Sequence, residues 1–194
     1  VDHGKTTLVD EMLKQGGVYR ENQEVVDRVM DSGDLERERG ITMFSKQAVL
    51  PLEGVEVTLL DTPGHVDFSA EAERALQVLD YAVLVVSGTD GVQAHTETLW
   101  KLLARYRVPT FVFVNKMDLP GADAAVRLRE LRGRFGDGCV DFSAVPDPEA
   151  LALCSEPLMN EVLDTGTPAP ETVITAIAPV SYTHLRAHET CADL

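Results

Sequence analysis

The feature that most constrains this chain is an alternation between short apolar runs and amphipathic stretches. Residues 81–86 and 110–114 are almost wholly apolar, as expected for strands buried on both faces. Residues 96–106 and 122–135 carry apolar side chains at helical spacing. The alternation predicts an α/β fold, with a mostly parallel sheet and helices on both of its faces.

The same periodicities predict the remaining elements. Predicted helices span residues 6–14, 68–79, 149–163 and 170–178, and predicted strands span residues 43–52, 55–60 and 139–142. The pair Gly16-Gly17 is expected to end the first helix, and Glu53-Gly54 predicts a tight turn that joins the first two strands as a hairpin. Residues 19–41 are polar without an apolar face, which predicts a mobile surface segment.

Composition excludes several classes of protein. With 17 basic and 32 acidic residues the net charge is −15, which argues against DNA binding and against binding to anionic membranes. No apolar run approaches the roughly 20 residues that a membrane-spanning helix needs. The three cysteines, Cys139, Cys154 and Cys191, form no recognisable motif. They fit a reducing compartment, so a cytoplasmic location is predicted.

The first residues contain the end of a phosphate-binding loop. Gly4-Lys5-Thr6 matches the last three positions of the pattern G-x-x-x-x-G-K-[ST]. In such a loop, backbone N–H groups surround the phosphates, the lysine adds positive charge and the hydroxyl ligates Mg²⁺. The first position of the pattern would precede Val1, which predicts a chain truncated within the loop, with the first strand of the sheet missing.

A second candidate loop, Asp61-Thr62-Pro63-Gly64, follows the strand predicted at residues 55–60. A carboxylate at the carboxyl end of a strand can hold the Mg²⁺ of a nucleotide, usually through water, and Gly64 would let its N–H approach the γ-phosphate. A turn capped by an aspartate is the alternative interpretation. The presence of Lys5 upstream favours the nucleotide site.

The third loop, Asn115-Lys116-Met117-Asp118, follows the strand predicted at residues 110–114. The carboxylate of Asp118 can accept hydrogen bonds from N1 and from the exocyclic amine of guanine, whereas adenine presents an acceptor at N1. The Asn115 amide can serve the other edge of the base, and the aliphatic stem of Lys116 can cover a ring face. Three such loops in this order predict GTP as the nucleotide.

With these loops identified, residues 1 to about 178 resemble the N-terminal GTP-binding domain, a P-loop NTPase G domain, of translational GTPases of the elongation factor G group. Within that group the ribosomal-protection tetracycline-resistance proteins are the most similar, because residues 149–178 resemble their insertion. The resemblance implies that Thr42, in Arg39-Gly40-Ile41-Thr42, ligates Mg²⁺ in a first switch. It also implies that His65, in a second switch, orients the attacking water.

The resemblance completes the predicted site. The implied catalytic residue is His65. The residues implied to contact phosphate are Asp2, His3, Gly4, Lys5, Thr6, Thr7 and Gly64. Those implied to contact guanine are Asn115, Lys116 and Asp118, and those implied to hold Mg²⁺ are Thr6, Thr42 and Asp61. The implied partners are GTP, GDP and the ribosome.

Three segments are predicted along the chain: a GTP-binding domain over residues 1–138, the start of an insertion subdomain over residues 139–178, and a non-native end over residues 179–194. The last segment is assigned because residues 180–190 resemble a translated sequencing-library adapter. The alternative is a genuine tail in which His184, His188 and Cys191 bind a metal, since the His-x-x-x-His spacing puts two imidazoles on one helix face.

The implied activity is GTP hydrolysis coupled to ribosome binding, in a protein that protects ribosomes from tetracycline. One alternative is a housekeeping elongation factor G that drives translocation. Another is a nucleotide-binding module without turnover, against which Lys5, Thr6, Thr42 and His65 argue. Residues 1–194 expressed alone are expected to be inactive and to bind GTP weakly or not at all, because loss of a central strand leaves backbone groups of its neighbours unpaired.

Overall fold

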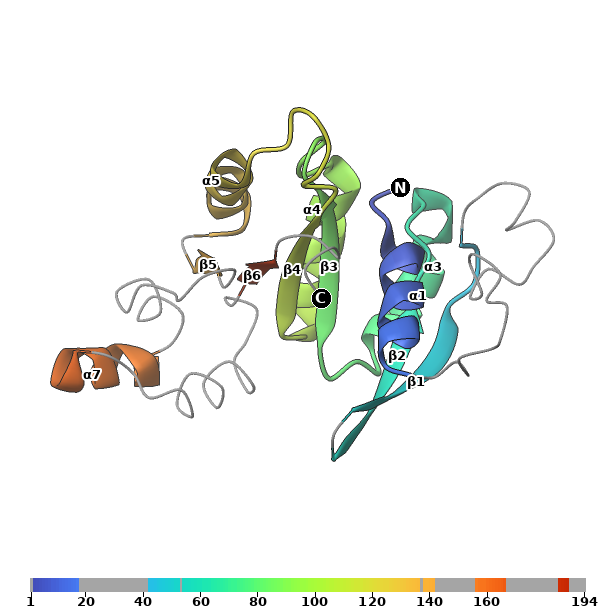
Figure 1. Ribbon diagram of the computed structural model, residues 1–194, viewed down its shortest axis with the longest axis horizontal. Coiled ribbons are helices and arrows are strands. Elements are labelled where there is room, and N and C mark those ends of the chain that lie inside the picture. Colours follow the sequence, from blue (N-terminus) through green and yellow to red (C-terminus); the bar gives the residue numbers. More distant parts are fainter. Residues whose placement is uncertain are drawn as a thin grey trace. The chain divides into compact units, whose positions relative to one another are not determined.

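The computed structural model describes residues 2–17, 42–52, 54–136, 138–141, 156–166 and 185–188. The chain divides into two compact units, Val1–Val78 and Leu79–Leu194. Figure 1 labels the α-helices and the β-strands of both units. Predictions made for residues 19–41 and 170–178 lie outside the described residues.

The first unit contains a helix, a β-hairpin and a second short helix. In chain order its elements are α1 (Lys5–Gln15), β1 (Lys46–Leu52), β2 (Val55–Asp61), the 3-10 helix η1 (Val66–Phe68) and α3 (Ser69–Leu76). Strands β1 and β2 pair antiparallel, with Lys46 opposite Asp61. Gly54 in the turn has a φ of 78°, which glycine adopts without steric cost. The predicted hairpin is confirmed.

Helix α1 lies against this hairpin (Figure 1). Leu13 of α1 and Leu50 of β1 form the buried centre of the contact, and burying a leucine stabilises a fold by about 1.5–3 kcal/mol. The partly buried side chains around them are Val9, Met12, Ala48, Val57 and Leu59. Gly16 follows the helix, and a Cβ at this position would collide with the side chain of Leu50. The predicted end of the helix at Gly16-Gly17 is therefore confirmed, and it also has a packing reason.

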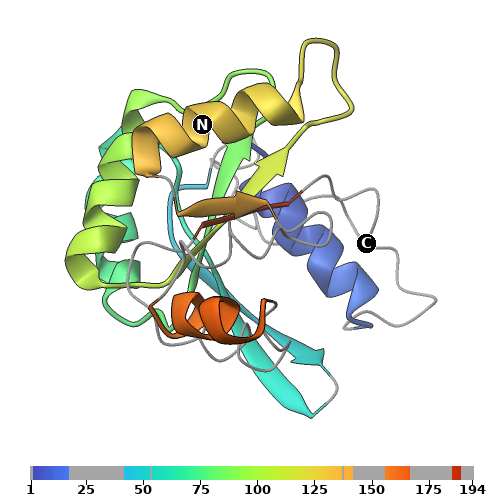
Figure 2. The ribbon, with the colours of Figure 1, turned by 90° about the vertical axis from the view of Figure 1, so that its left-hand side faces the viewer.

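The second unit is a parallel α/β layer. Its elements are β3 (Ala82–Ser87), α4 (Ala94–Tyr106), β4 (Thr110–Asn115), α5 (Ala124–Phe135), β5 (Cys139–Asp141), α7 (Glu156–Thr165) and β6 (Leu185–His188). The strands are parallel in the order β3-β4-β6-β5. Helix α4 makes the crossover from β3 to β4 (Figure 2). The rings of Trp100 and Phe135 join α4 to α5, with centroids 4.8 Å apart.

The core of this unit gathers apolar side chains from strands and helices. Val86 of β3, Val112 of β4, Leu131 of α5 and Val140 of β5 are among those that are almost completely buried. At the start of β3 the burial is weaker, because the Val83 side chain remains 53% exposed. Helix α5 also differs in detail from its predicted pattern.

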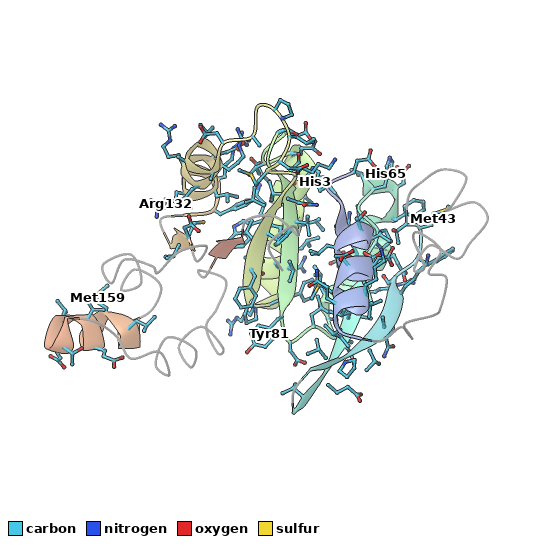
Figure 3. All side chains as sticks on the ribbon, viewed as in Figure 1. His3, Met43, His65, Tyr81, Arg132 and Met159 are labelled. Atoms are coloured by element: carbon cyan, nitrogen blue, oxygen red, sulfur yellow. The ribbon has the colours of Figure 1, made fainter. Side chains whose placement is uncertain are left out.

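In α5 the sequence predicts Val126 facing inward and the arginines mainly outward. The structure reverses two of these positions, because Val126 is exposed while Arg127 is half-buried. Arg127 pairs with Glu130, and Arg132 donates from Nε to the carbonyl oxygen of Cys139 at 3.0 Å. Figure 3 labels Arg132 on this helix. Guanidinium groups can occupy half-buried positions when such acceptors are present.

Strand β6 lies between β4 and β5, with Ala187 opposite both Val112 and Asp141. Because the backbone of almost any sequence can pair in this way, the assignment of residues 179–194 to a translated adapter stays a prediction. His188 lies in a strand, which removes the helical spacing on which the alternative metal site depends. Among the described residues, no helix is long and apolar enough to cross a membrane.

Candidate nucleotide-binding site

The start of α1 is shaped by two residues in left-handed conformations. Asp2 has a φ of 60° and Gly4 a φ of 87°. The carbonyl oxygen of Gly4 accepts the first helical hydrogen bond, from the N–H of Leu8 at 2.9 Å. The chain therefore turns sharply into the helix and directs its first N–H groups, the positive end of the helix dipole, toward one place. This geometry suits a bound phosphate.

Lys5 lies directly after this turn and is partly buried. Burial lowers the pKa of Lys5 below its ordinary value of 10.5, and the nearby carboxylates of Asp61 and Asp2 oppose the shift. The Nζ atom lies against the backbone of Gly64, at the place that a Cβ on this residue would fill. A glycine here lets the lysine head and the second loop occupy adjacent positions.

Three oxygen-bearing side chains meet beside this lysine. The Oγ1 atoms of Thr6 and Thr42 lie 2.9 Å apart, and Thr6 Oγ1 donates to Asp61 Oδ2 at 2.8 Å. Thr42 and Asp61 are both buried. In the described part of the chain no three His, Cys, Asp or Glu side chains form a metal cluster. Two hydroxyls and a carboxylate are nevertheless the hard oxygen donors that Mg²⁺ prefers, so this set fits that ion.

The remaining residues predicted for the phosphates differ in exposure. His3 is buried, whereas Asp2 and Thr7 are exposed at the start of α1. Figure 3 labels His3 and His65, both in the part of the first unit where α1 begins. The structure thus brings the predicted phosphate and metal residues of the first unit toward one end of α1.

His65 caps η1 and is partly exposed. Its Nδ1 accepts a hydrogen bond from the N–H of Asp67 at 3.3 Å and lies 3.3 Å from the Asp67 carboxylate. Its ring centroid is 6.2 Å from that of Phe68. A neutral imidazole that accepts at Nδ1 carries its proton on Nε2. The described contacts of the ring run to Asp67 and Phe68, not to the three-oxygen cluster.

The predicted guanine loop lies in the second unit, directly after β4. Lys116 has a φ of 62°, a conformation that costs a non-glycine residue about 1–2 kcal/mol. The peptide before it is fixed, because the carbonyl oxygen of Asn115 accepts from the N–H of Gly88 at 2.7 Å. Asp118 is exposed and available to a ligand.

Gly88 is a contributor that the sequence analysis did not identify. A Cβ on Gly88 would collide with the sulfur of Met117, so the absence of a side chain lets the β3–α4 and β4–α5 loops pack closely. The available signal is positional: Gly88 directly follows the end of β3, and Gly64 likewise lies in the loop after β2.

Comparison with known proteins agrees with this geometry. The family described as elongation factor Tu GTP binding domain matches residues 1–185. The chain belongs to this family, and the predicted P-loop α/β fold and the resemblance to translational GTPases are confirmed.

Two curated proteins also match a large part of this chain. The chain is 47% identical over 162 residues to the oxytetracycline resistance protein of Streptomyces rimosus, which covers 81% of this chain and 24% of that protein. It is 47% identical over 123 residues to the large ribosomal subunit assembly factor BipA of a Synechocystis strain, covering 63% and 21%. The chain thus spans about a quarter or less of the length of these relatives.

A solved structure shares the fold. A crystal structure of a Thermus thermophilus protein superposes with a TM-score of 0.80 at 24% identity, covering 98% of this chain and 36% of that one. At this identity the likeness supports the fold.

Proposed function

We propose that the chain binds GTP with Mg²⁺ and hydrolyses the GTP when the protein is on a ribosome. The observation that carries this proposal is the convergence of Thr6, Thr42 and Asp61. Their oxygens meet within hydrogen-bond distance although the residues are 36 and 55 positions apart in the sequence. A partly buried cluster assembled from three distant segments is expected where a ligand is bound by all three.

The phosphates would bind at the start of α1. The turn at Gly4 directs backbone N–H groups there, and Lys5 supplies a positive charge. Burial alone disfavours that charge, as the direction of the Lys5 pKa shift indicates. A bound anionic phosphate would favour the charged form of Lys5. The phosphate would therefore offset the cost of burying this charge in the nucleotide-free protein.

Thr6, Thr42 and Asp61 would hold the metal ion. When bound, Mg²⁺ would neutralise charge that develops on the phosphoryl oxygens. The bond from the Thr6 hydroxyl to Asp61 keeps this oxygen set together. Gly64 would let the second loop approach the γ-phosphate, because a side chain there would occupy the place of the Lys5 head.

His65 would orient the attacking water. Its Nδ1 is engaged by the N–H of Asp67, which leaves Nε2–H as the group that can contact a water molecule. The partly exposed ring can reorient without disrupting a core. We infer that the ribosome is the partner that sets its orientation, so turnover would depend on docking. Loss of the γ-phosphate would then release Thr42 and Gly64.

Asp118, Asn115 and Lys116 would select guanine. The left-handed conformation of Lys116 turns the chain between Asn115 and Asp118. Asp118 would accept two hydrogen bonds from the guanine edge, which adenine cannot offer in the same pattern.

The role we favour is ribosomal protection against tetracycline, in the cytoplasm. The match to the oxytetracycline resistance protein covers 81% of this chain, whereas the match to BipA covers 63%. Because the two matches have the same identity, the longer one favours the role of the drug-resistance relative over that of BipA. A housekeeping elongation factor G and a module without turnover are the alternatives that the test separates.

The test is GTP hydrolysis by the protein expressed from its complete gene, with and without ribosomes. We expect strong stimulation by ribosomes, loss of that stimulation in His65→Ala, and retention of it in the matched variant His95→Ala, whose histidine lies in α4. Expression in a tetracycline-sensitive host should raise the inhibitory drug concentration. Turnover without ribosomes, or a fully active His65→Ala variant, would contradict the mechanism. Ribosome-stimulated turnover without drug protection would favour the elongation factor.

A further inference from the structure

The β3–α4 loop, residues 88–93, contacts the proposed guanine loop near one end and α5 near the other. Gly91 in this loop has a φ of 68°, and its N–H donates to the carbonyl oxygen of Ser87 at 2.9 Å. The hydroxyl of the fully buried Ser87 accepts from the N–H of Asp90 at 3.2 Å. These two bonds hold Asp90 and Gly91 against Ser87, so the loop forms a tight turn directly after β3.

Two charged residues of α5 hold the far end of this loop. Glu130 Oε1 accepts from the N–H of Val92 at 3.2 Å, and Glu130 Oε2 accepts from Arg127 Nη1 at 2.5 Å. Both side chains are largely shielded from water, with 24% and 17% of their surfaces exposed. The space beside Gly91 is filled by these two heads, because a Cβ there would collide with both. Glu130 therefore fixes both a helix neighbour and a loop backbone.

The near end of the loop meets the guanine loop. The N–H of Gly88 donates to the carbonyl oxygen of Asn115, which belongs to the peptide joining Asn115 to Lys116. The orientation of this peptide sets the φ of Lys116, whose left-handed value is unfavourable by itself. A strained conformation persists only where surrounding contacts impose it. The Gly88 bond is such a contact.

We propose that Glu130, held by Arg127, is a positioning residue for guanine selectivity. It acts through the β3–α4 loop, which fixes the Asn115–Lys116 peptide and thereby the place of Asp118. This inference rests on the proposed assignment of the guanine loop. Neither Glu130 nor Arg127 needs to contact the nucleotide. The two residues would determine where the base-binding groups lie. Their substitution should therefore change the ratio of affinities for nucleotides with different bases.

Selectivity can be measured with GTP and ITP, since inosine lacks the exocyclic amine of guanine. In the full-length protein, Glu130→Ala should lower the ratio of GTP to ITP affinity by about three- to tenfold, because the bond to a carboxylate is sensitive to its placement. Glu130→Gln keeps an oxygen for the Val92 N–H and should recover most of the ratio. Glu97→Ala is the matched control, since Glu97 pairs with Arg134 and lies outside the β3–α4 loop.

The outcomes separate this inference from the proposed function. A parent protein that binds GTP and ITP equally would overturn both the guanine assignment and the role of Glu130. A selective parent with an unchanged ratio in Glu130→Ala would overturn the role of Glu130 alone. Equal weakening of both nucleotides, with a lower melting temperature, would show a merely structural residue. If Glu130→Ala does not fold, Arg127→Met gives the same comparison, because it leaves the Glu130 carboxylate without its guanidinium partner.

Discussion

The phosphate region of the first unit and the guanine region of the second are built in opposite ways. The phosphate region joins side chains from three distant segments, and Thr6 bonds to both Thr42 and Asp61. The guanine region is one continuous loop, held by a backbone hydrogen bond from Gly88. Substitutions in the first region should therefore remove binding chemistry outright. Substitutions around the second should alter selectivity while much of the affinity remains.

The largest effect is expected from removing the charge of Lys5. Lys5→Met should weaken GTP binding by about 100-fold or more, because a charge-assisted contact to phosphate is lost in a shielded place. Lys14→Met is the matched control, since Lys14 lies on the same helix, is partly exposed and pairs with Glu11. Titration with a fluorescent GTP analogue measures both. Equal affinities for the two variants would remove Lys5 from the site.

The second prediction concerns the base. Asp118→Asn should lower GTP affinity by about tenfold or more and raise affinity for XTP, because xanthine carries a carbonyl where guanine carries an amine. Asp123→Asn is the control, since Asp123 caps α5 by accepting from the N–H of Val126, which asparagine also does well. Competition binding with both nucleotides gives the ratio. If Asp118→Asn still prefers GTP to XTP, Asp118 does not contact the base.

The contrast between the regions explains what could be read from the sequence. The sequence predicts the loops at Lys5, Asp61 and Asn115 because their residue types are specific to the chemistry and each loop lies at an end of a predicted element. The hairpin and the β3, α4 and β4 elements followed from apolar periodicity. Local patterns carry these signals, so no tertiary information was needed.

Long-range contacts were not readable in the same way. The inward position of Arg127 depends on its pairing with Glu130 and on the space beside Gly91. The helical pattern alone predicts that such charged residues lie on the solvent-facing side of the helix. The close approach of Gly88 to Met117 depends on two loops that are separated in sequence. The helix predicted over residues 68–79 is confirmed as α3, although α3 ends at Leu76 and the 3-10 helix η1 precedes it.

A third prediction compares two glycines. Gly64→Ala should weaken GTP binding by about tenfold, because its methyl group would displace the Lys5 head from its place and with it part of a charge-assisted contact. Gly133→Ala in α5 meets open space and should bind GTP normally. It should also be more stable by about 0.5–1 kcal/mol, as alanine is the better helix former. Binding and thermal melting test the pair, and a normal Gly64→Ala variant would contradict the assigned contact.

The smallest effect is a pH dependence that belongs to the phosphate region alone. The pKa of Lys5 is lowered by burial from its ordinary 10.5. Between the lowered pKa and 10.5 the unfolded chain binds a proton that the folded chain does not, so stability rises with pH in this window. One group contributes at most about 1.4 kcal/mol per pH unit. The melting temperature of the nucleotide-free parent, relative to that of Lys5→Met, should therefore rise as the pH approaches 10.5 from below. A constant difference would mean that Lys5 keeps its charge in the fold, and the phosphate region would then bind anions without the cost that its burial implies.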